Sequence, residues 1–175
     1  MTFKVNAVRT LTSPYRRDEK ESGMYETIYY LLVNMRDLPE NIPMDVNPRV
    51  PKMGTNVAKR LIHAVVEPET DFCINNRGIV ISAQAFSFNS ADSEVTIDLG
   101  EQNDENDRFS YGILDGGHTY TAIMQNRDKI PENIEKYVRI EVIISVLNIT
   151  RLSDARNTSV QVERIHPFQN VTVVW

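Results

Sequence analysis

The alternation of hydrophobic and polar positions along the chain predicts a set of short strands. Alternating side chains, or short apolar runs rich in aromatic and β-branched residues, are typical of strands. Such patterns cover residues 2–12, 25–35, 72–75, 78–88, 93–99, 109–114 and 137–147. A helix is the alternative for 25–35. Residues 93–99 alternate cleanly, which predicts a hairpin with 78–88.

Three segments carry helical patterns instead. Thr55 is a suitable N-cap for a helix over 56–66, in which Val57, Leu61, Ala64 and Val65 recur at helical spacing. Helices are also predicted from Gly117 to Asn126 and over 150–157. Loops are expected at the charged residues 13–23, at 38–51 with its four prolines, and at the acidic residues 100–108.

The order of these elements predicts an α+β fold, with a mixed sheet and few helices. We expect a single sheet in a single domain spanning 1–175, with an N-terminal arm (1–23), a core (24–165) and a C-terminal segment (166–175). The chain ends on the apolar residues NVTVVW, which have the pattern of a strand. This ending suggests a fragment of a longer protein.

Composition is that of an ordinary globular protein, with 41% hydrophobic and 25% charged residues. The net charge of −5 is uneven: residues 61–110 hold 2 Lys/Arg against 10 Asp/Glu, whereas residues 1–60 hold 10 against 7. A nucleic-acid-binding surface over the whole molecule is therefore not expected. A local basic patch or a solvated face could come from Arg9, Arg16, Arg17, Lys20, Lys52, Lys59 and Arg60.

Targeting and redox signals are sparse. Cys73 is the only cysteine, which excludes an internal disulfide. Nothing resembles a signal peptide, and no apolar run approaches the roughly 18 residues that span a membrane. We expect a cytoplasmic protein with no membrane partner.

The stretch DGGHT (115–119), between a predicted strand and a predicted helix, is a candidate anion site. Glycines let the backbone turn tightly and let a ligand approach closely. The first N–H groups of a helix lack internal acceptors and bind anions at the positive end of the helix dipole. Gly116, Gly117 and Thr119 would contact the ligand, with His118 adding a charge or hydrogen bond and Thr121 a hydroxyl. Asp115 could hold the loop, a ribose hydroxyl or a metal ion. A simple tight turn capped by Asp115 is the alternative.

Two further polar clusters are candidate ligand contacts. Asn75 and Asn76 could read a base edge or bind phosphate, and Arg77 could grip phosphate with two hydrogen bonds; a turn is the alternative. Arg156 and Asn157 follow the predicted strand 137–147, where a helix cap is the alternative. We expect all three clusters to line one concave surface.

Two of these segments carry family resemblances. LDGGHTYTAI (114–123) resembles the DGQHR-type signature of the ParB/sulfiredoxin-like superfamily. Together with DFCINNRGIVISAQAF (71–86) it resembles the AIPR (abortive infection phage resistance) family, in which an F-x-x-x-NNG-I block precedes an I-V-N-G-G-Q-T-x-x-A block. The matches are Phe72, Asn75, Asn76, Gly78 and Ile79, then Gly116, Gly117, Thr119 and Ala122. Arg77 is an insertion, and Asp115 and His118 replace the usual Asn and Gln.

This resemblance covers roughly residues 25–165 and implies a ParB/sulfiredoxin-like domain in phage defence or DNA-modification-linked work. The domain would bind a nucleotide, with Mg²⁺ as a candidate cofactor, or a nucleic-acid phosphate. One alternative is a nuclease or NTPase in which Asp115 and His118 are catalytic. The other is a non-catalytic regulatory or interaction module. No metal ligands are predicted, and homo-oligomer formation is left open.

Overall fold

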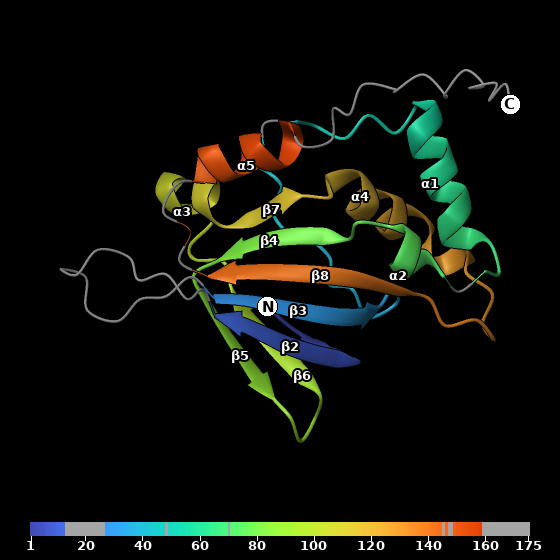
Figure 1. The fold of residues 1–175 in the computed structure, drawn as a ribbon, viewed down its shortest axis with the longest axis horizontal. Helices are drawn as coiled ribbons and strands as arrows, with labels where there is room; N and C mark the ends of the chain where they lie inside the picture. The colour runs from blue at the N-terminus through green and yellow to red at the C-terminus, as the bar shows by residue number, and fades with distance from the viewer. Residues whose placement is uncertain (13–26, 48, 70, 145, 147–148, 159–175) are drawn as a thin grey trace, which may run out of the picture.

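The computed structural model describes residues 1–12, 27–47, 49–69, 71–144, 146 and 149–158. It confirms the predicted α+β fold, with strands and helices in similar amounts (Figure 1). The N-terminal arm beyond residue 12 and the C-terminal segment, with the predicted final strand, lie outside the described residues.

A five-stranded sheet forms the centre of the domain, and a smaller three-stranded sheet packs against it. The larger sheet has the order β2-β3-β8-β4-β7, and the smaller one has the order β1-β6-β5. Within the five-stranded sheet, β4 and β8 are parallel and the other neighbouring pairs are antiparallel. The strands are β1 (Thr2–Lys4), β2 (Ala7–Thr12), β3 (Thr27–Asn34), β4 (Ile79–Ala83), β5 (Ala85–Asn89), β6 (Glu94–Asp98), β7 (Gly112–Asp115) and β8 (Tyr137–Ile144).

Helices cover the two ends of the larger sheet. Figure 1 shows α1, α2 and α4 gathered at one end and α3 and α5 at the other. The helices are α1 (Asn56–Val66), α2 (Phe72–Asn75), α3 (Glu105–Ser110), α4 (Gly117–Asn126) and α5 (Ile149–Thr158), and a 3₁₀ turn (Arg127–Lys129) follows α4. Helix α1 packs on α4, and α5 packs on β7.

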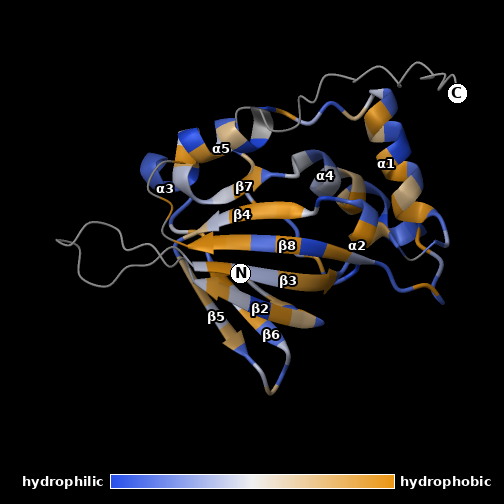
Figure 2. Ribbon diagram, viewed as in Figure 1, coloured by the Kyte–Doolittle hydropathy of each residue, from blue (hydrophilic) through white to orange (hydrophobic). Residues whose placement is uncertain are grey.

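Strand β4 is buried on both faces because the larger sheet is covered on both sides. Ile79 and Ile81 belong to the main core, which the smaller sheet completes with Val95 and Ile97. Val80 belongs to a second cluster, on which residues of α5 pack. Burial on both faces explains why this strand is an unbroken apolar run rather than an alternating one, as its colouring in Figure 2 shows.

The predicted single sheet is wrong, because the chain changes sheets at Gln84. The predicted strand 78–88 is β4 and β5, which belong to different sheets. The predicted strand 2–12 is likewise divided into β1 and β2. The predicted hairpin is confirmed for the second half of 78–88, since β5 and β6 form an antiparallel pair. The two sheets meet where the rings of Tyr29 and Phe86 stack, with centroids 3.9 Å apart.

Two other predictions need correction. Residues 72–75 form the one-turn helix α2, because only Phe72 packs inside, whereas a buried strand would also need Ile74, which is 76% exposed. The acidic segment 100–108 is not all loop. The side chain of Asp104 accepts hydrogen bonds from the N–H groups of Asn106 and Asp107 and so caps α3, which also takes Phe109 out of the predicted strand.

The remaining elements agree with their predictions. Residues 27–34 are a strand rather than a helix, 38–47 contain no helix or strand, and α1 and α4 have the predicted bounds. Thr55 caps α1, since its hydroxyl oxygen accepts a hydrogen bond from the N–H of Ala58. Val57 is an exception within α1, because it is 74% exposed and does not reach the core.

Candidate functional site

The turns that precede β4 and follow β7 lie against each other. These strands are antiparallel neighbours, with Val80 paired to Asp115, so the chain entering β4 meets the chain leaving β7. Gly116 has a φ of +82°, and a Cβ there would clash with the carbonyl oxygen of Gly78. Sheet pairing and glycine contact therefore bring the NNRG and DGGHT segments together, as expected. Gly116 is the left-handed residue of the turn, and Gly117 is the first residue of α4.

The first turn of α4 presents unpaired backbone donors. The N–H of Gly116 donates to Oδ1 of Asp115 (2.7 Å), and the N–H of Tyr120 donates to the carbonyl oxygen of Gly116 (2.9 Å). No described residue accepts a hydrogen bond from the N–H groups of Gly117, His118 or Thr119. These three groups form the positive end of the α4 dipole.

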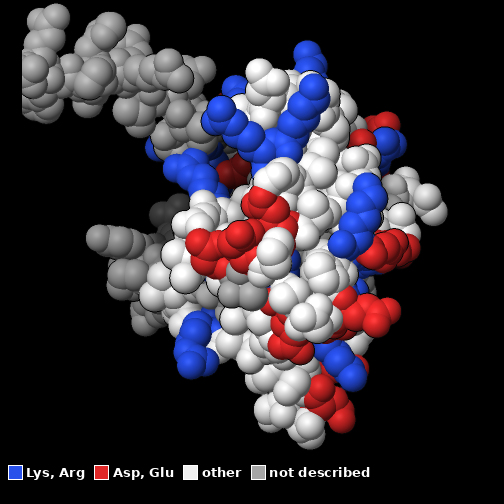
Figure 3. Space-filling view, turned by 90° about the vertical axis from the view of Figure 1, so that its right-hand side faces the viewer, with Lys and Arg blue, Asp and Glu red and all other residues white. Residues whose placement is uncertain are grey.

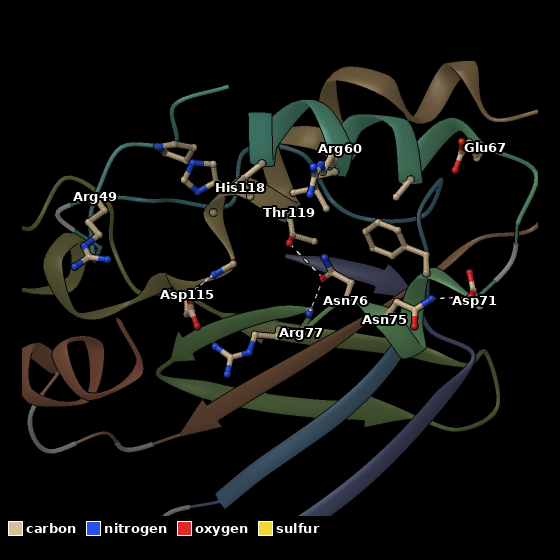
Figure 4. A pocket seen from close by; sticks show the side chains of 18 of the residues that line it. Arg49, Arg60, Glu67, Asp71, Asn75, Asn76, Arg77, Asp115, His118 and Thr119 are labelled. Atoms are coloured by element: carbon tan, nitrogen blue, oxygen red, sulfur yellow. Dashed lines mark hydrogen bonds between the residues drawn. The ribbon is translucent and has the colours of Figure 1, made fainter. Parts of the chain in front are cut away.

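Asn76 links the two turns through one oxygen. Its Oδ1 accepts hydrogen bonds from the N–H of Gly78 (2.7 Å) and from Oγ1 of Thr119 (3.3 Å), as Figure 4 shows. Because a backbone N–H can only donate, the atom facing Gly78 must be the oxygen. The Nδ2 amide of Asn76 is therefore directed away from this contact. A third bond, from Arg139 to the carbonyl oxygen of Asn76 (2.7 Å), fixes the backbone of the turn.

The side chain of His118 connects the start of α4 to the segment before α1. Its Nε2 accepts a hydrogen bond from the N–H of Lys52 (3.1 Å). Nδ1 is the other hydrogen-bonding atom of the ring. The ring therefore holds the segment before α1 through Nε2.

A pocket of about 830 Å³ lies between α1, α2 and the start of α4. Eight of the predicted ligand contacts and catalytic residues line it: Asn75, Asn76, Arg77, Asp115, Gly116, Gly117, His118 and Thr119. Thr119 is only 6% exposed. The wall opposite these residues is a stripe of α1 at helical spacing, made by Val57, Arg60, Leu61 and Ala64, and Glu67 continues it just after the helix.

Three arginines line the pocket, and we call them its basic end: Arg49, Arg60 and Arg77. Within the described part of the chain, none of these guanidinium groups has a hydrogen bond or ion pair. Arginines elsewhere are engaged: Arg36 with backbone carbonyls, Arg108 with Asp45, and Arg127 with Glu40. The unengaged arginines that line the pocket are therefore available to an anionic ligand.

The acidic end of the pocket consists of Glu67, Glu69 and Asp71. Figure 4 shows Glu67 and Asp71 on the side of the pocket away from Arg49 and Asp115. On the face drawn in Figure 3, groups of Lys/Arg and of Asp/Glu lie beside one another rather than forming one continuous basic surface.

The third predicted cluster does not reach the pocket, so the expectation of one shared surface is wrong for it. Arg156 pairs with Glu141, with Nη2 2.5 Å from Oε1. Residues that follow β8 lie at the sheet end opposite to those that precede its parallel neighbour β4. The side chain of Asn157 lies outside the described residues. Thr121 also fails to line the pocket, and its buried hydroxyl has no described partner.

Sequence reasoning missed the arginine pair Arg49 and Arg60 and the whole acidic end. Arg60 stood among the basic residues of a candidate patch, but the other described members of that set do not line the pocket. Arg60 follows Val57 by three residues, which places both on one face of α1, and this spacing was the signal that the sequence offered. Among the described residues, no group of three or more His, Cys, Asp or Glu side chains could hold a metal ion. No helix in the described ranges is long and apolar enough to cross a membrane.

Comparison with known protein families gives a match to this chain. No curated protein and no solved structure shows significant similarity to the chain. The family described as "AIPR protein" matches residues 44–172, which is more than half of the chain and includes both turns at the pocket. The chain therefore belongs to the AIPR family.

Proposed function

We propose that this AIPR domain acts in phage defence by binding a phosphate-bearing ligand, a nucleotide or a nucleic-acid strand, at the first turn of α4. The observation that carries the proposal is the set of three unpaired N–H groups, of Gly117, His118 and Thr119, opening into the pocket. Anions bind such groups because they satisfy the donors and lie at the positive end of the helix dipole. The resemblance of the DGGHT turn to DGQHR-type signatures, in which such turns carry phosphate contacts, supports the same assignment.

The basic end supplies the charge that this ligand needs. Arg60 and Arg77 line the pocket from opposite walls, and Arg49 lines it from the segment before α1. Guanidinium groups form charge-assisted and often paired hydrogen bonds with phosphate oxygens. The glycine at position 116 lets the turn lie directly against Gly78, which holds the first turn of α4 beside the NNRG segment.

The contacts of Asp115 and His118 favour a binding module over an acid–base enzyme. Oδ1 of Asp115 holds the N–H of Gly116, and Nε2 of His118 holds the N–H of Lys52. Both side chains thus shape the turn and the neighbouring segment. In the proposed function Asp115 and His118 position the phosphate site, and Nδ1 of His118 remains as a donor.

The test is a calorimetric titration with the four ribonucleoside monophosphates and a short single-stranded oligonucleotide. We expect Arg60→Gln to weaken binding by roughly 1.5–3 kcal/mol, the range for hydrogen bonds to charged groups. Lys59→Gln is the matched control, since Lys59 is its exposed neighbour on α1 and does not line the pocket. Equal losses in the two variants, or binding that neither variant weakens, would contradict the proposal.

A further inference from the structure

The pocket is longer than a phosphate site needs. Four side chains of α1 line it from Val57 to Ala64, a span of about 10 Å at the helical rise per residue, and Glu67 extends the lining just beyond the helix. The stripe changes character along the helix, from the cationic Arg60 through the apolar Leu61 and Ala64 to the anionic Glu67. A ligand that fills it must therefore be anionic at one end and offer hydrogen-bond donors at the other.

The three carboxylates of the acidic end differ in the partners that they contact. Glu67 pairs with His63 on the exposed side of α1. Oδ2 of Asp71 accepts a hydrogen bond from Nδ2 of Asn75 (2.6 Å), which orients the carboxylate and leaves Oδ1 without a described partner. Glu69 has no ion pair among the described residues. These groups can only accept hydrogen bonds when ionised.

A buried ammonium lies behind this end of the pocket. Nζ of Lys136 donates to the carbonyl oxygens of Ala64 (2.5 Å) and Glu67 (2.7 Å), and it does not line the pocket. Its positive charge is close enough to interact electrostatically with all three carboxylates. The surface that faces the ligand is still made of acceptors alone.

Asn76 places a donor between the two ends. Its oxygen is used twice, by Gly78 and Thr119, so the amide cannot rotate without losing both bonds. Figure 4 shows Asn76 between Thr119 and the pair formed by Asn75 and Asp71. Its Nδ2 has no described partner. Passing from Asn76 towards the acidic end, the lining thus offers a donor and then a carboxylate acceptor.

We propose that this part of the pocket binds a guanine base, as the free nucleotide or as one unit of a single strand. Guanine presents the acceptor O6 next to the donors N1–H and N2–H, which complements Nδ2 of Asn76 followed by the carboxylate of Asp71. Adenine and cytosine place a ring-nitrogen acceptor beside their amino group, and uracil carries carbonyl acceptors on both sides of its one donor. Each can place only one donor against the carboxylate and an acceptor against Nδ2 of Asn76, whereas guanine places two donors, N1–H and N2–H, against the carboxylate. The inference rests on the proposed phosphate site, which anchors the same ligand.

The experiment compares GMP, IMP and AMP, because IMP lacks the 2-amino group and AMP reverses the edge. We expect the wild-type chain to bind GMP about tenfold more tightly than IMP or AMP, the scale of one good base-edge contact. Asp71→Asn should lower GMP affinity more than IMP affinity, because GMP donates two hydrogen bonds to this carboxylate and IMP donates only one, from N1–H. The asparagine oxygen can still accept from Asn75, and a urea unfolding midpoint checks the fold. Glu132→Gln, at an exposed position outside the pocket, is the control.

The outcomes separate the two proposals. Equal affinities for all three nucleotides, with all three weakened by Arg60→Gln, would overturn the guanine site and leave the phosphate site standing. No binding of any nucleotide or oligonucleotide would overturn both. A thymine oligonucleotide with one central guanine, compared with its inosine counterpart, identifies the source. Tighter binding of the guanine strand than of GMP supports a nucleic-acid ligand, and the reverse supports the free nucleotide.

Discussion

At the residue scale, Gly116 is the position where the backbone most restricts the choice of side chain at the site. Its φ of +82° is unfavourable for other residues, and a Cβ would clash with the backbone of Gly78 and Ile79. We expect Gly116→Ala to lower the free energy of unfolding by roughly 1–3 kcal/mol, measured by urea denaturation. Gly54→Ala is the control, because a Cβ at Gly54 would meet no atom within 4 Å. Similar stability of the two variants would refute this role of the turn.

Thr119 and Thr121 provide a second matched pair on one helix. The hydroxyl of Thr119 bonds Oδ1 of Asn76 at the pocket, whereas that of Thr121 is buried outside it without a described partner. Thr119→Ala should therefore weaken nucleotide binding by roughly 1–3 kcal/mol, as expected for a lost hydrogen bond near a charged ligand. Thr121→Ala should leave binding unchanged. Retention of full affinity in a folded Thr119→Ala variant would show that the hydroxyl serves the turn alone.

At the scale of elements, the sequence predicts best those whose pattern is long and whose caps are local. Thr55 and the two glycines of DGGHT mark the starts of α1 and α4 to the residue, because capping depends on neighbours in the chain. Residues 27–34 and 137–144 are strands whose β-branched and aromatic content decided the prediction. These elements also position most of the candidate site.

The short apolar runs of the sequence do not contain enough information to distinguish a strand from a helix. Residues 72–75 contain three apolar side chains, and periodicity cannot separate one buried turn of helix from a strand of that length. The division of 78–88 at Gln84 depends on which partner each half finds, which is a tertiary property. The acidic end was missed for a similar reason, since Glu67, Glu69 and Asp71 line a cavity only because α1 packs on α4 and α2 packs on β8.

Lys136 joins the start of β8 to the end of α1 and gives the fold a pH dependence. Burial opposes its charge and lowers its pKa below the ordinary value of 10.5, although nearby carboxylates act in the opposite direction. Between the lowered pKa and 10.5 the unfolded chain binds more protons, so this group adds stability as pH rises and loses it as pH falls.

The comparison of wild type with Lys136→Met isolates this contribution from other groups. The difference in unfolding free energy between the two proteins should increase with pH in the alkaline range below 10.5. The variant should also be less stable overall, because the carbonyl oxygens of Ala64 and Glu67 lose their donor. Lys59→Met, on the exposed face of α1, controls for removal of a lysine. A difference that does not vary with pH would contradict the assigned effect of burial.

At the scale of the whole molecule, two sheets and their helices place the pocket at one end of the domain. The larger sheet is covered by the smaller sheet on one face and by α5 on the other, which leaves its end near α1, α2 and α4 for a ligand (Figure 1). The overall charge of −5 does not predict an anion site. What matters is the local arrangement, in which unengaged arginines and helix N–H groups face the same cavity.

The most direct test of the central claim, that a phosphate-bearing ligand binds the first turn of α4, is an NMR titration. Backbone amide resonances would be followed in the ¹⁵N-labelled chain as GMP and, separately, inorganic phosphate are added. The account predicts that the largest shifts, with both ligands, fall on the amides of Gly117, His118 and Thr119, and that Arg60→Gln weakens the response. Shifts centred elsewhere, with these three amides unchanged at saturation, would contradict it.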